Sequence, residues 1–183
     1  MIANLIARSG EKDFVQAVAK SVARLRGSFA LGIMTENKLI GIRDPHGFRP
    51  LCLGKLDGAY VLASESCALD TVDAEFIRDI EPGEMVIIDE NGVRSYFYTE
   101  PQPKALCIFE FIYFARPDSV IDGMSVQLVR NAYGKRLALE HPVEADLVIP
   151  VPDSGTSAAI GYAEQSKIPF GEGLVKNRYV GRT

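Results

Sequence analysis

The stretch Asp146-Leu-Val-Ile-Pro-Val-Pro-Asp-Ser-Gly-Thr-Ser-Ala-Ala-Ile160 decides the fold of the C-terminal part of this chain. Its first half is a nearly continuous apolar run, which is typical of a central strand in a parallel sheet. A short turn that carries hydroxyl groups follows, and it opens a helix predicted over residues 156–165. Because the amides at the start of a helix favour anions, this arrangement predicts a site for a phosphorylated ligand.

The sequence on either side extends this α/β pattern. Helical periodicity over residues 124–139 precedes the strand, and Ile168-Pro-Phe170 begins the next strand. The order helix, strand, helix, strand predicts the beginning of a doubly wound α/β fold. The basic segment Val175-Lys-Asn-Arg-Tyr-Val-Gly-Arg-Thr183 follows. Such a short cationic cluster suits a small polyanion, and a solvated or disordered loop is the alternative.

The N-terminal part of the sequence predicts a different architecture. Residues 28–98 contain short apolar runs joined by turn sequences such as Asp57-Gly58 and Glu90-Asn91-Gly92, which indicates an antiparallel sheet rich in hairpins. Helices are expected over residues 12–25 and 66–71. Pro101-Gln-Pro103 interrupts the pattern and marks a boundary.

The segment after this boundary, residues 107–114, is apolar and aromatic. We expect it to be buried between two layers of structure. A strip that stacks on nucleic-acid bases would need basic residues between its aromatic residues, and only Arg116 is near.

Composition limits the class of protein. The chain has 183 residues, of which 47% are hydrophobic and 24% charged, as in soluble globular proteins. A formal net charge of −4 argues against nucleic acid as the main partner. No apolar stretch is long enough for a membrane span. Three scattered cysteines without a CxxC pair argue against a disulfide framework and favour a reducing, cytoplasmic location.

Several blocks resemble one family of enzymes. Arg43-Asp-Pro-His-Gly-Phe-Arg-Pro-Leu51 and Ala63-Ser-Glu-Ser-Cys-Ala-Leu-Asp70 resemble the glutaminase domain of the amidophosphoribosyltransferases. Phe109-Glu-Phe-Ile-Tyr-Phe-Ala-Arg-Pro-Asp-Ser119 resembles the segment that joins the two domains of these enzymes. The stretches from Val148 to Ser154 and from Lys176 to Thr183 resemble the opening of their phosphoribosyltransferase domain.

The resemblance implies a fold and a reaction. Residues 1–103 would form the C-terminal part of an N-terminal-nucleophile-hydrolase sandwich, and residues 104–183 a linker and the beginning of a type I phosphoribosyltransferase parallel sheet. Enzymes of this family are glycosyltransferases that release ammonia from glutamine at an N-terminal cysteine. They transfer this ammonia to phosphoribosyl pyrophosphate in the first step of purine biosynthesis. The resemblance also implies a homo-oligomeric parent enzyme.

The resemblance also assigns site residues. Ser154 would lie near Mg²⁺ and the pyrophosphate group, or it would cap the following helix. The amides of Gly155, Thr156 and Ser157 would bind an anion at the helix start. The remaining substrate-binding candidates belong to a loop that would close over phosphoribosyl pyrophosphate and exclude water: Lys176, Arg178, Tyr179, Gly181 and Arg182.

The cysteines and histidines have separate interpretations. One branch of the family holds a [4Fe–4S] cluster, and the resemblance makes Cys107 one of its four ligands in the parent enzyme, with a buried core thiol as the alternative. Cys52 and Cys67 are interpreted as core residues. His46 and His141 are interpreted as turn residues. Arg43 and Asp44, which border the turn at His46, are assigned a structural role.

The chain departs from the family pattern. Ile2 follows Met1, so no cysteine nucleophile is present at the N-terminus, and the Asp-Asp pair that binds ribose and metal in the family is missing. We therefore expect an internal part of a longer enzyme, which alone has neither activity, holds neither Mg²⁺ nor a cluster, and tends to associate through uncovered apolar surface. The alternative is a non-catalytic module that binds phosphate-containing ligands.

Overall fold

The computed structural model describes residues 1–100, 102–177 and 179–181. The chain divides into two compact units, Met1–Cys107 and Ile108–Thr183. The boundary predicted after residue 103 lies a few residues before this division. Both units mix helices and strands, as predicted.

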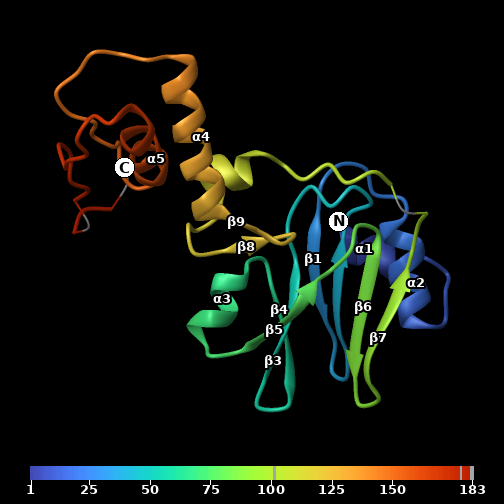
Figure 1. Cartoon of the computed structure of the whole chain (residues 1–183). Coiled ribbons are helices and arrows are strands. Elements are labelled where there is room, and N and C mark those ends of the chain that lie inside the picture. Colours follow the sequence, from blue (N-terminus) through green and yellow to red (C-terminus); the bar gives the residue numbers. More distant parts are fainter. Residues whose placement is uncertain (101, 178, 182–183) are drawn as a thin grey trace. The chain divides into compact units, whose positions relative to one another are not determined.

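Two helices begin the first unit (Figure 1). They are α1 (Ile2–Ala7) and α2 (Phe14–Val22). Asp13 caps α2, because its carboxylate accepts a hydrogen bond from the Gln16 amide at 2.9 Å. Isolated turn hydrogen bonds continue to Leu25, so the helix predicted over residues 12–25 is confirmed with shorter ends.

A four-stranded antiparallel sheet follows, with the strand order β1-β2-β6-β7. Its strands are β1 (Ala30–Met34), β2 (Leu39–Arg43), β6 (Glu84–Asp89) and β7 (Gly92–Phe97). The hairpin of β6 and β7 was predicted from its turn at Glu90-Asn91-Gly92, which is local in sequence. Only the pairing of β2 with β6 joins distant segments.

A three-stranded antiparallel sheet has the order β4-β3-β5. It consists of β3 (Cys52–Leu56), β4 (Ala59–Ala63) and β5 (Glu75–Asp79), and α3 (Ser66–Thr71) connects β4 to β5. The tight turn predicted at Asp57-Gly58 is present, with φ of 48° and 87°. Strand β5 was not predicted, because most of this edge strand is exposed and it lacks the alternation of a half-buried strand.

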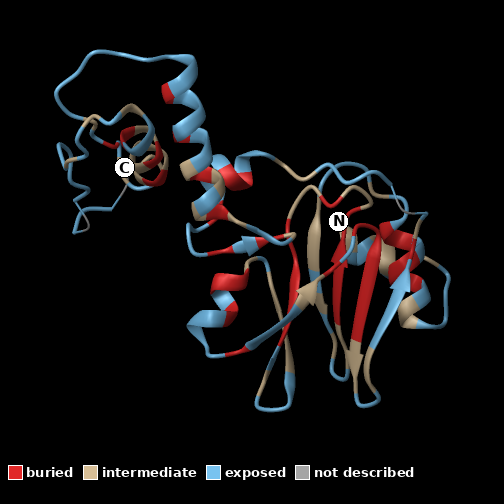
Figure 2. Ribbon diagram, in the orientation of Figure 1, coloured by how far each residue is buried: buried red, intermediate tan, exposed pale blue. Residues whose placement is uncertain are grey.

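The apolar clusters show that the first unit is layered. Helix α2 packs Val18 and Val22 against Ile40 and Met85 on one face of the four-stranded sheet. The opposite face packs Val86 against a cluster from the smaller sheet: Leu51, Leu53 and Ile80. A third cluster joins α3 to the outer face of the smaller sheet through Leu69, Cys52 and Ala74. The order is therefore helix, sheet, sheet, helix, with burial concentrated in the inner strands (Figure 2).

A buried polar network fixes the loop between β2 and β3. Arg43 is 1% exposed, and its guanidinium donates to the carbonyls of Arg49, Gly47 and Ile80. Asp44 is fully buried and accepts from the amides of His46 and Phe48. These contacts support the structural role assigned to Arg43 and Asp44.

The second unit begins with a single helical turn and a small hairpin. Its elements are the π-helix η1 (Glu110–Phe114), β8 (Val120–Ile121), β9 (Met124–Ser125), α4 (Val126–Glu140) and α5 (Thr156–Ser166). Ser125 caps α4 by accepting from the Leu128 amide. Helices α4 and α5 therefore confirm the two predicted for residues 124–139 and 156–165, within two residues at each end.

The buried side of α4 does not contain the leucines of this helix. Leu128, Leu137 and Leu139 are 49–68% exposed. The buried positions follow a four-residue spacing instead: Val126, Arg130, Gly134 and Ala138. Val126, two small residues and a hydrogen-bonded arginine, rather than leucines, therefore form the buried side of this helix.

Two further expectations for the second unit need correction. Phe109, Tyr113 and Phe114 are about half exposed, so burial of the whole segment 107–114 is wrong, although Glu110 and Phe111 are buried. The strand predicted over residues 147–151 forms one isolated parallel bridge, between Val148 and Phe170. The described residues thus contain a parallel pairing but no extended parallel sheet.

Candidate functional site

The turn that the sequence singled out lies between the parallel bridge and α5. The Val148 amide donates to the Pro169 carbonyl at 2.8 Å, and the Gly171 amide donates to the Val148 carbonyl at 3.0 Å. Residues 150–155 then lead directly into α5. Gly155 permits the tight approach there, because a Cβ atom at this position would lie 2.7 Å from the Val151 carbonyl oxygen.

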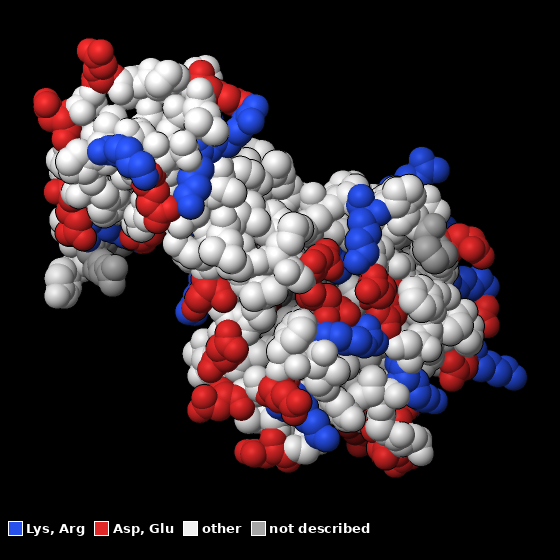
Figure 3. All heavy atoms as spheres, viewed as in Figure 1, with Lys and Arg blue, Asp and Glu red and all other residues white. Residues whose placement is uncertain are grey.

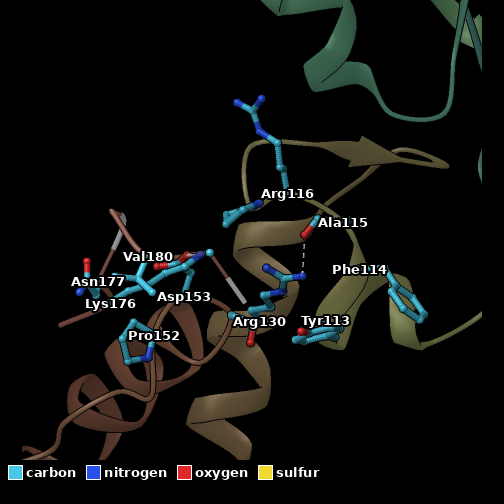
Figure 4. Close-up of a pocket in the computed structure, with 13 residues that line it drawn as sticks. Tyr113, Phe114, Ala115, Arg116, Arg130, Pro152, Asp153, Lys176, Asn177 and Val180 are labelled. Carbon is cyan, nitrogen blue, oxygen red and sulfur yellow. Dashed lines mark hydrogen bonds and ion pairs between the residues drawn. The ribbon is translucent and has the colours of Figure 1, made fainter. Parts of the chain in front are cut away.

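A pocket of about 570 Å³ opens beside this turn, within the second unit (Figure 4). One wall is the segment from Tyr113 to Pro117, and the opposite wall contains Asp153 and Ser154. Residues of the C-terminal segment complete it: Lys176, Asn177, Val180 and Gly181. The pocket therefore brings together three of the predicted site residues, which are Ser154, Lys176 and Gly181.

The other predicted site residues have different places. Thr156 lines a second, adjoining cavity of about 260 Å³. Ser157 is buried, and its hydroxyl donates to Gln127 Oε1 on α4 at 2.6 Å. Tyr179 is fully exposed. Arg178 and Arg182 lie outside the described residues.

The amides at the start of α5 already have acceptors in the protein. The Gly155 amide donates to the Val151 carbonyl at 3.3 Å, and the Thr156 amide donates to the Asp153 carbonyl at 3.2 Å. Ser154 does not cap the helix, because the N-cap position is Gly155 and has no side-chain hydrogen bond. Binding of an anion by these two amides would therefore require the turn to exchange its internal hydrogen bonds.

The charged groups that line the pocket are paired. Lys176 Nζ lies 2.8 Å from Asp153 Oδ2, with both side chains about half exposed. Arg116 donates to both carboxylate oxygens of Asp118, and these hydrogen bonds lower the pKa of Asp118 below its ordinary value. Figure 4 shows the Arg116 side chain extending away from Arg130 and Lys176. A bound anion would thus compete with carboxylates for these cations.

Oxygen donors at the pocket suit a hard cation. Ser154 and Asp153 are neighbours in the sequence and both line the pocket, and Mg²⁺ in phosphate-binding sites typically takes one or two protein oxygens together with phosphate and water. These two residues therefore offer oxygen donors to a Mg²⁺ ion that arrives with a phosphorylated ligand, whereas the expectation that the chain alone holds no Mg²⁺ stays a prediction.

The cysteines do not form a cluster site in the described part of the chain. Cys107 is half buried, and Cys52 and Cys67 are buried core residues, as predicted. Among the residues that the structure describes, no group of three or more cysteine, histidine or acidic side chains could hold a metal ion. One thiolate at Cys107 does not fit a cluster that needs four ligands.

The two histidines are turn or terminal residues. His46 lies in the turn after β2, and its Nδ1 atom lies 3.2 Å from the Pro103 carbonyl oxygen. His141 is the C-cap residue of α4. Both placements agree with the interpretation made from the sequence.

Arg130 and Asp153 line the pocket but were not predicted as site residues. No local sequence signal marks Arg130, because its burial depends on contacts with Phe111 and Ala115 in another segment. Asp153 directly precedes the serine that was selected, and its pairing with Lys176 joins residues 23 positions apart. Such a pairing is not visible in local sequence.

The surface carries charges of both signs. Acidic and basic side chains are interspersed on the face of each unit seen in Figure 3.

Among the described residues, none of the helices is long and apolar enough to cross a membrane.

The N-terminal part of the chain matches a known domain family, and nearly the whole chain is similar to known enzymes. The model of a glutamine amidotransferase domain matches residues 3–71. The chain is 57% identical over 175 residues to an amidophosphoribosyltransferase of Mycobacterium tuberculosis, covering 96% of this chain and 33% of that protein. It is 50% identical over 183 residues to an amidophosphoribosyltransferase of Bacillus subtilis, covering 100% of this chain and 38% of that protein.

A solved structure of one of these enzymes has the same fold as this chain over the matched part. Glutamine phosphoribosylpyrophosphate amidotransferase from Bacillus subtilis, complexed with ADP and GMP, matches with a TM-score of 0.96 at 50% identity, over 99% of this chain and 40% of that one. Over nearly its whole length, the chain is therefore similar to part of the amidophosphoribosyltransferases. It spans about a third to two-fifths of the length of these relatives.

Proposed function

We propose that this chain is a part of an enzyme that transfers nitrogen from glutamine to phosphoribosyl pyrophosphate, which forms phosphoribosylamine in the first step of purine biosynthesis. The observation that carries the proposal is the 50% identity to the Bacillus subtilis enzyme over all 183 residues. The layered first unit then corresponds to the N-terminal-nucleophile-hydrolase sandwich of the glutaminase domain. The second unit corresponds to the beginning of the phosphoribosyltransferase domain.

The chemistry of the pocket supports a pyrophosphate-containing ligand. Lys176 would exchange Asp153 for an oxygen of the pyrophosphate group and stabilise the negative charge that develops as this group leaves. Ser154 and Asp153 would hold Mg²⁺, which when bound neutralises the same charge. The segment from Lys176 to Gly181 would cover the ribose and exclude water.

Burial disfavours Cys52 and Cys67 as nucleophiles of a glutaminase reaction. Burial raises the pKa of Cys52 to about 12, with a further contribution from the Asp79 carboxylate, so the thiolate form is scarce near neutral pH. Cys67 is buried, and its thiol lies 3.7 Å from Glu65 Oε2. We also propose that the parent enzyme is cytoplasmic and homo-oligomeric. If it holds a [4Fe–4S] cluster, Cys107 would be one of the four ligands, and the other three would come from parts of the enzyme outside this chain.

Calorimetric titration tests the proposed ligand. Phosphoribosyl pyrophosphate with Mg²⁺ is expected to bind the 183-residue chain, and Lys176→Ala is expected to weaken binding by about tenfold, since one charge-assisted hydrogen bond is lost. Lys135→Ala is the matched control, because Lys135 is an exposed lysine of the same unit that pairs with Glu164. No heat of binding to the folded chain would contradict the proposal. Equal losses in both variants would exclude a specific role for Lys176.

A further inference from the structure

Arg130 is a large charged side chain on the buried side of α4. It is 2% exposed and lies between Val126 and Gly134 on that side of the helix. An arginine in this position costs free energy unless hydrogen bonds replace its lost hydration. Its contacts therefore indicate why the position holds an arginine.

The guanidinium of Arg130 binds backbone carbonyls at the end of η1. It donates through Nε to Phe111 and through Nη2 to Ala115, at 2.8 Å from the Ala115 oxygen. A longer contact of 3.5 Å reaches the Glu110 carbonyl. Figure 4 shows the Arg130 side chain reaching from α4 to Ala115. Carbonyl groups at the end of a helical turn carry partial negative charge, so a cation stabilises them.

The hydrogen bonds of Arg130 matter because apolar packing holds the pocket wall at residues 113–117, and the turn before it, only weakly. Phe109, Ile112, Tyr113 and Phe114 are 43–53% exposed, whereas Phe111 and Ala115 are buried. The first turn of α4 adds two backbone contacts, from the Val126 amide to Ser119 and from the Gln127 amide to Pro117. Helix α4 thus fixes residues 110–119 largely through polar contacts.

The same helix also holds the opposite wall of the pocket. Gln127 accepts from the Ser157 hydroxyl at the start of α5. Gly134 and Gly161 allow close contact between the helices, since a Cβ atom on Gly134 would lie 1.8 Å from the Ala158 carbonyl oxygen. The separation of the two walls is therefore set by α4.

We propose that Arg130 is a positioning residue, which fixes the wall of residues 113–117 relative to Asp153 and Ser154 and so sets the affinity of the pocket for anions. Arg130 lines the pocket, but its Nε and Nη2 atoms are directed to backbone carbonyls, so we assign it a role through the wall and not as a ligand of the anion. The identity of the ligand rests on the proposed function, whereas the role of Arg130 in holding the wall does not.

Two measurements on the whole chain test this proposal. Hydrogen–deuterium exchange without ligand is expected to rise in residues 111–117 of Arg130→Ala. Titration with inorganic pyrophosphate and Mg²⁺ is expected to show at least about a tenfold loss of affinity. Guanidinium chloride at millimolar, non-denaturing concentration is expected to restore both properties, because the free cation can occupy the vacated space. Arg136→Ala is the control, since Arg136 is exposed on α4 and pairs with Glu140.

A second variant tests whether the donor geometry of Arg130 matters or only its positive charge. Arg130→Lys keeps the charge but loses the planar set of donors, so it is expected to lose affinity and exchange protection as Arg130→Ala does. Full affinity in Arg130→Lys would overturn the proposal, as would unchanged exchange in both variants. Arg130→Lys decides the question if Arg130→Ala does not fold. If the wild-type chain does not bind pyrophosphate, the proposed function fails, and the exchange data alone decide the role of Arg130.

Discussion

Glu84 is a buried carboxylate of β6 whose charge depends on three neighbours. Its side chain is 2% exposed and forms an ion pair with Arg78 at 2.6 Å. The Ser95 hydroxyl and the Glu81 amide also donate to it. Burial raises the pKa of Glu84, but these hydrogen bonds outweigh burial, and the net pKa is lowered. Glu84 therefore stabilises the fold above its unfolded pKa, and this contribution is lost as the pH falls through the folded value.

Replacement of Glu84 tests this linkage. Glu84→Gln is expected to reduce the free energy of unfolding at pH 7 by about 2 kcal/mol, because hydrogen bonds to a charged group are lost. It should also flatten the decline of stability below about pH 4. Urea unfolding followed by circular dichroism from about pH 3 to 7 measures both effects. The exposed Glu36→Gln is the control, and an unchanged pH dependence in Glu84→Gln would disprove the assignment.

The three thiols differ in exposure, and their reactivity should follow. Cys107 is half buried, whereas Cys52 and Cys67 are 1% and 4% exposed. At pH 8, iodoacetamide is expected to modify Cys107 at least about tenfold faster than Cys52, whose pKa of about 12 keeps it protonated. Peptide mass spectrometry of the folded chain measures these rates. Comparable labelling of Cys52 would show that the first unit opens readily. Labelling in urea, where iodoacetamide reaches all three thiols, is the control.

At the scale of elements, the contact between α4 and α5 depends on glycine. A Cβ atom on Gly161 would lie 2.1 Å from the Asn131 carbonyl oxygen, and Gly134 is as tightly enclosed. These distances leave no room for a methyl group unless the helices separate. The separation would also move the hydrogen bond between Gln127 and Ser157.

Alanine usually stabilises a helix relative to glycine, but Gly134→Ala is expected to destabilise the second unit. Helix propensity alone would stabilise α4 by about 1 kcal/mol. The steric conflict is expected to outweigh it and to destabilise the second unit by about 2–3 kcal/mol. Gly32→Ala is the control, because no atom lies within 4 Å of a Cβ atom there. Thermal unfolding measures both variants, and a stabilised Gly134→Ala would refute the close contact.

At the scale of the whole molecule, the first unit includes its own connecting segment. The Ala105 amide donates to His46 and the Cys107 amide to Phe48, at 2.9 and 3.0 Å. The Tyr98 hydroxyl donates to the Arg43 carbonyl, and the Tyr98 ring belongs to the core cluster beneath α2. Residues 98–100 and 102–107 therefore close the buried network around Arg43 and Asp44.

A polypeptide of residues 1–107 is expected to fold without the rest of the chain. Urea unfolding should be cooperative, because its helix, sheet, sheet and helix layers bury their apolar faces against one another. A polypeptide of residues 1–97 lacks Tyr98 and should be less stable by about 3 kcal/mol or more. Circular dichroism in urea compares the two. Absence of a cooperative transition for residues 1–107 would contradict the division into two units.

Most of the first unit could be predicted from the sequence, because its signals are local. Asp57-Gly58 determines a tight hairpin, and α3 was placed with its observed bounds. For the second unit, the sequence indicated both helices and the hydroxyl turn at Ser154. It did not indicate β5 of the first unit, whose place in the sheet depends on β3, or the pocket wall held by Arg130.

The sequence alone determined where helices, hairpins and turns form, since capping residues, glycines and apolar periodicity act over a few neighbouring positions. Its motifs also indicated the resemblance to the amidophosphoribosyltransferases. Only the tertiary structure decided which side of α4 is buried, that Lys176 pairs with Asp153, and that the guanidinium of Arg130 binds the carbonyls of Phe111 and Ala115. These features depend on distances between segments far apart in the chain, and a buried charge takes whichever partners the folded chain places beside it.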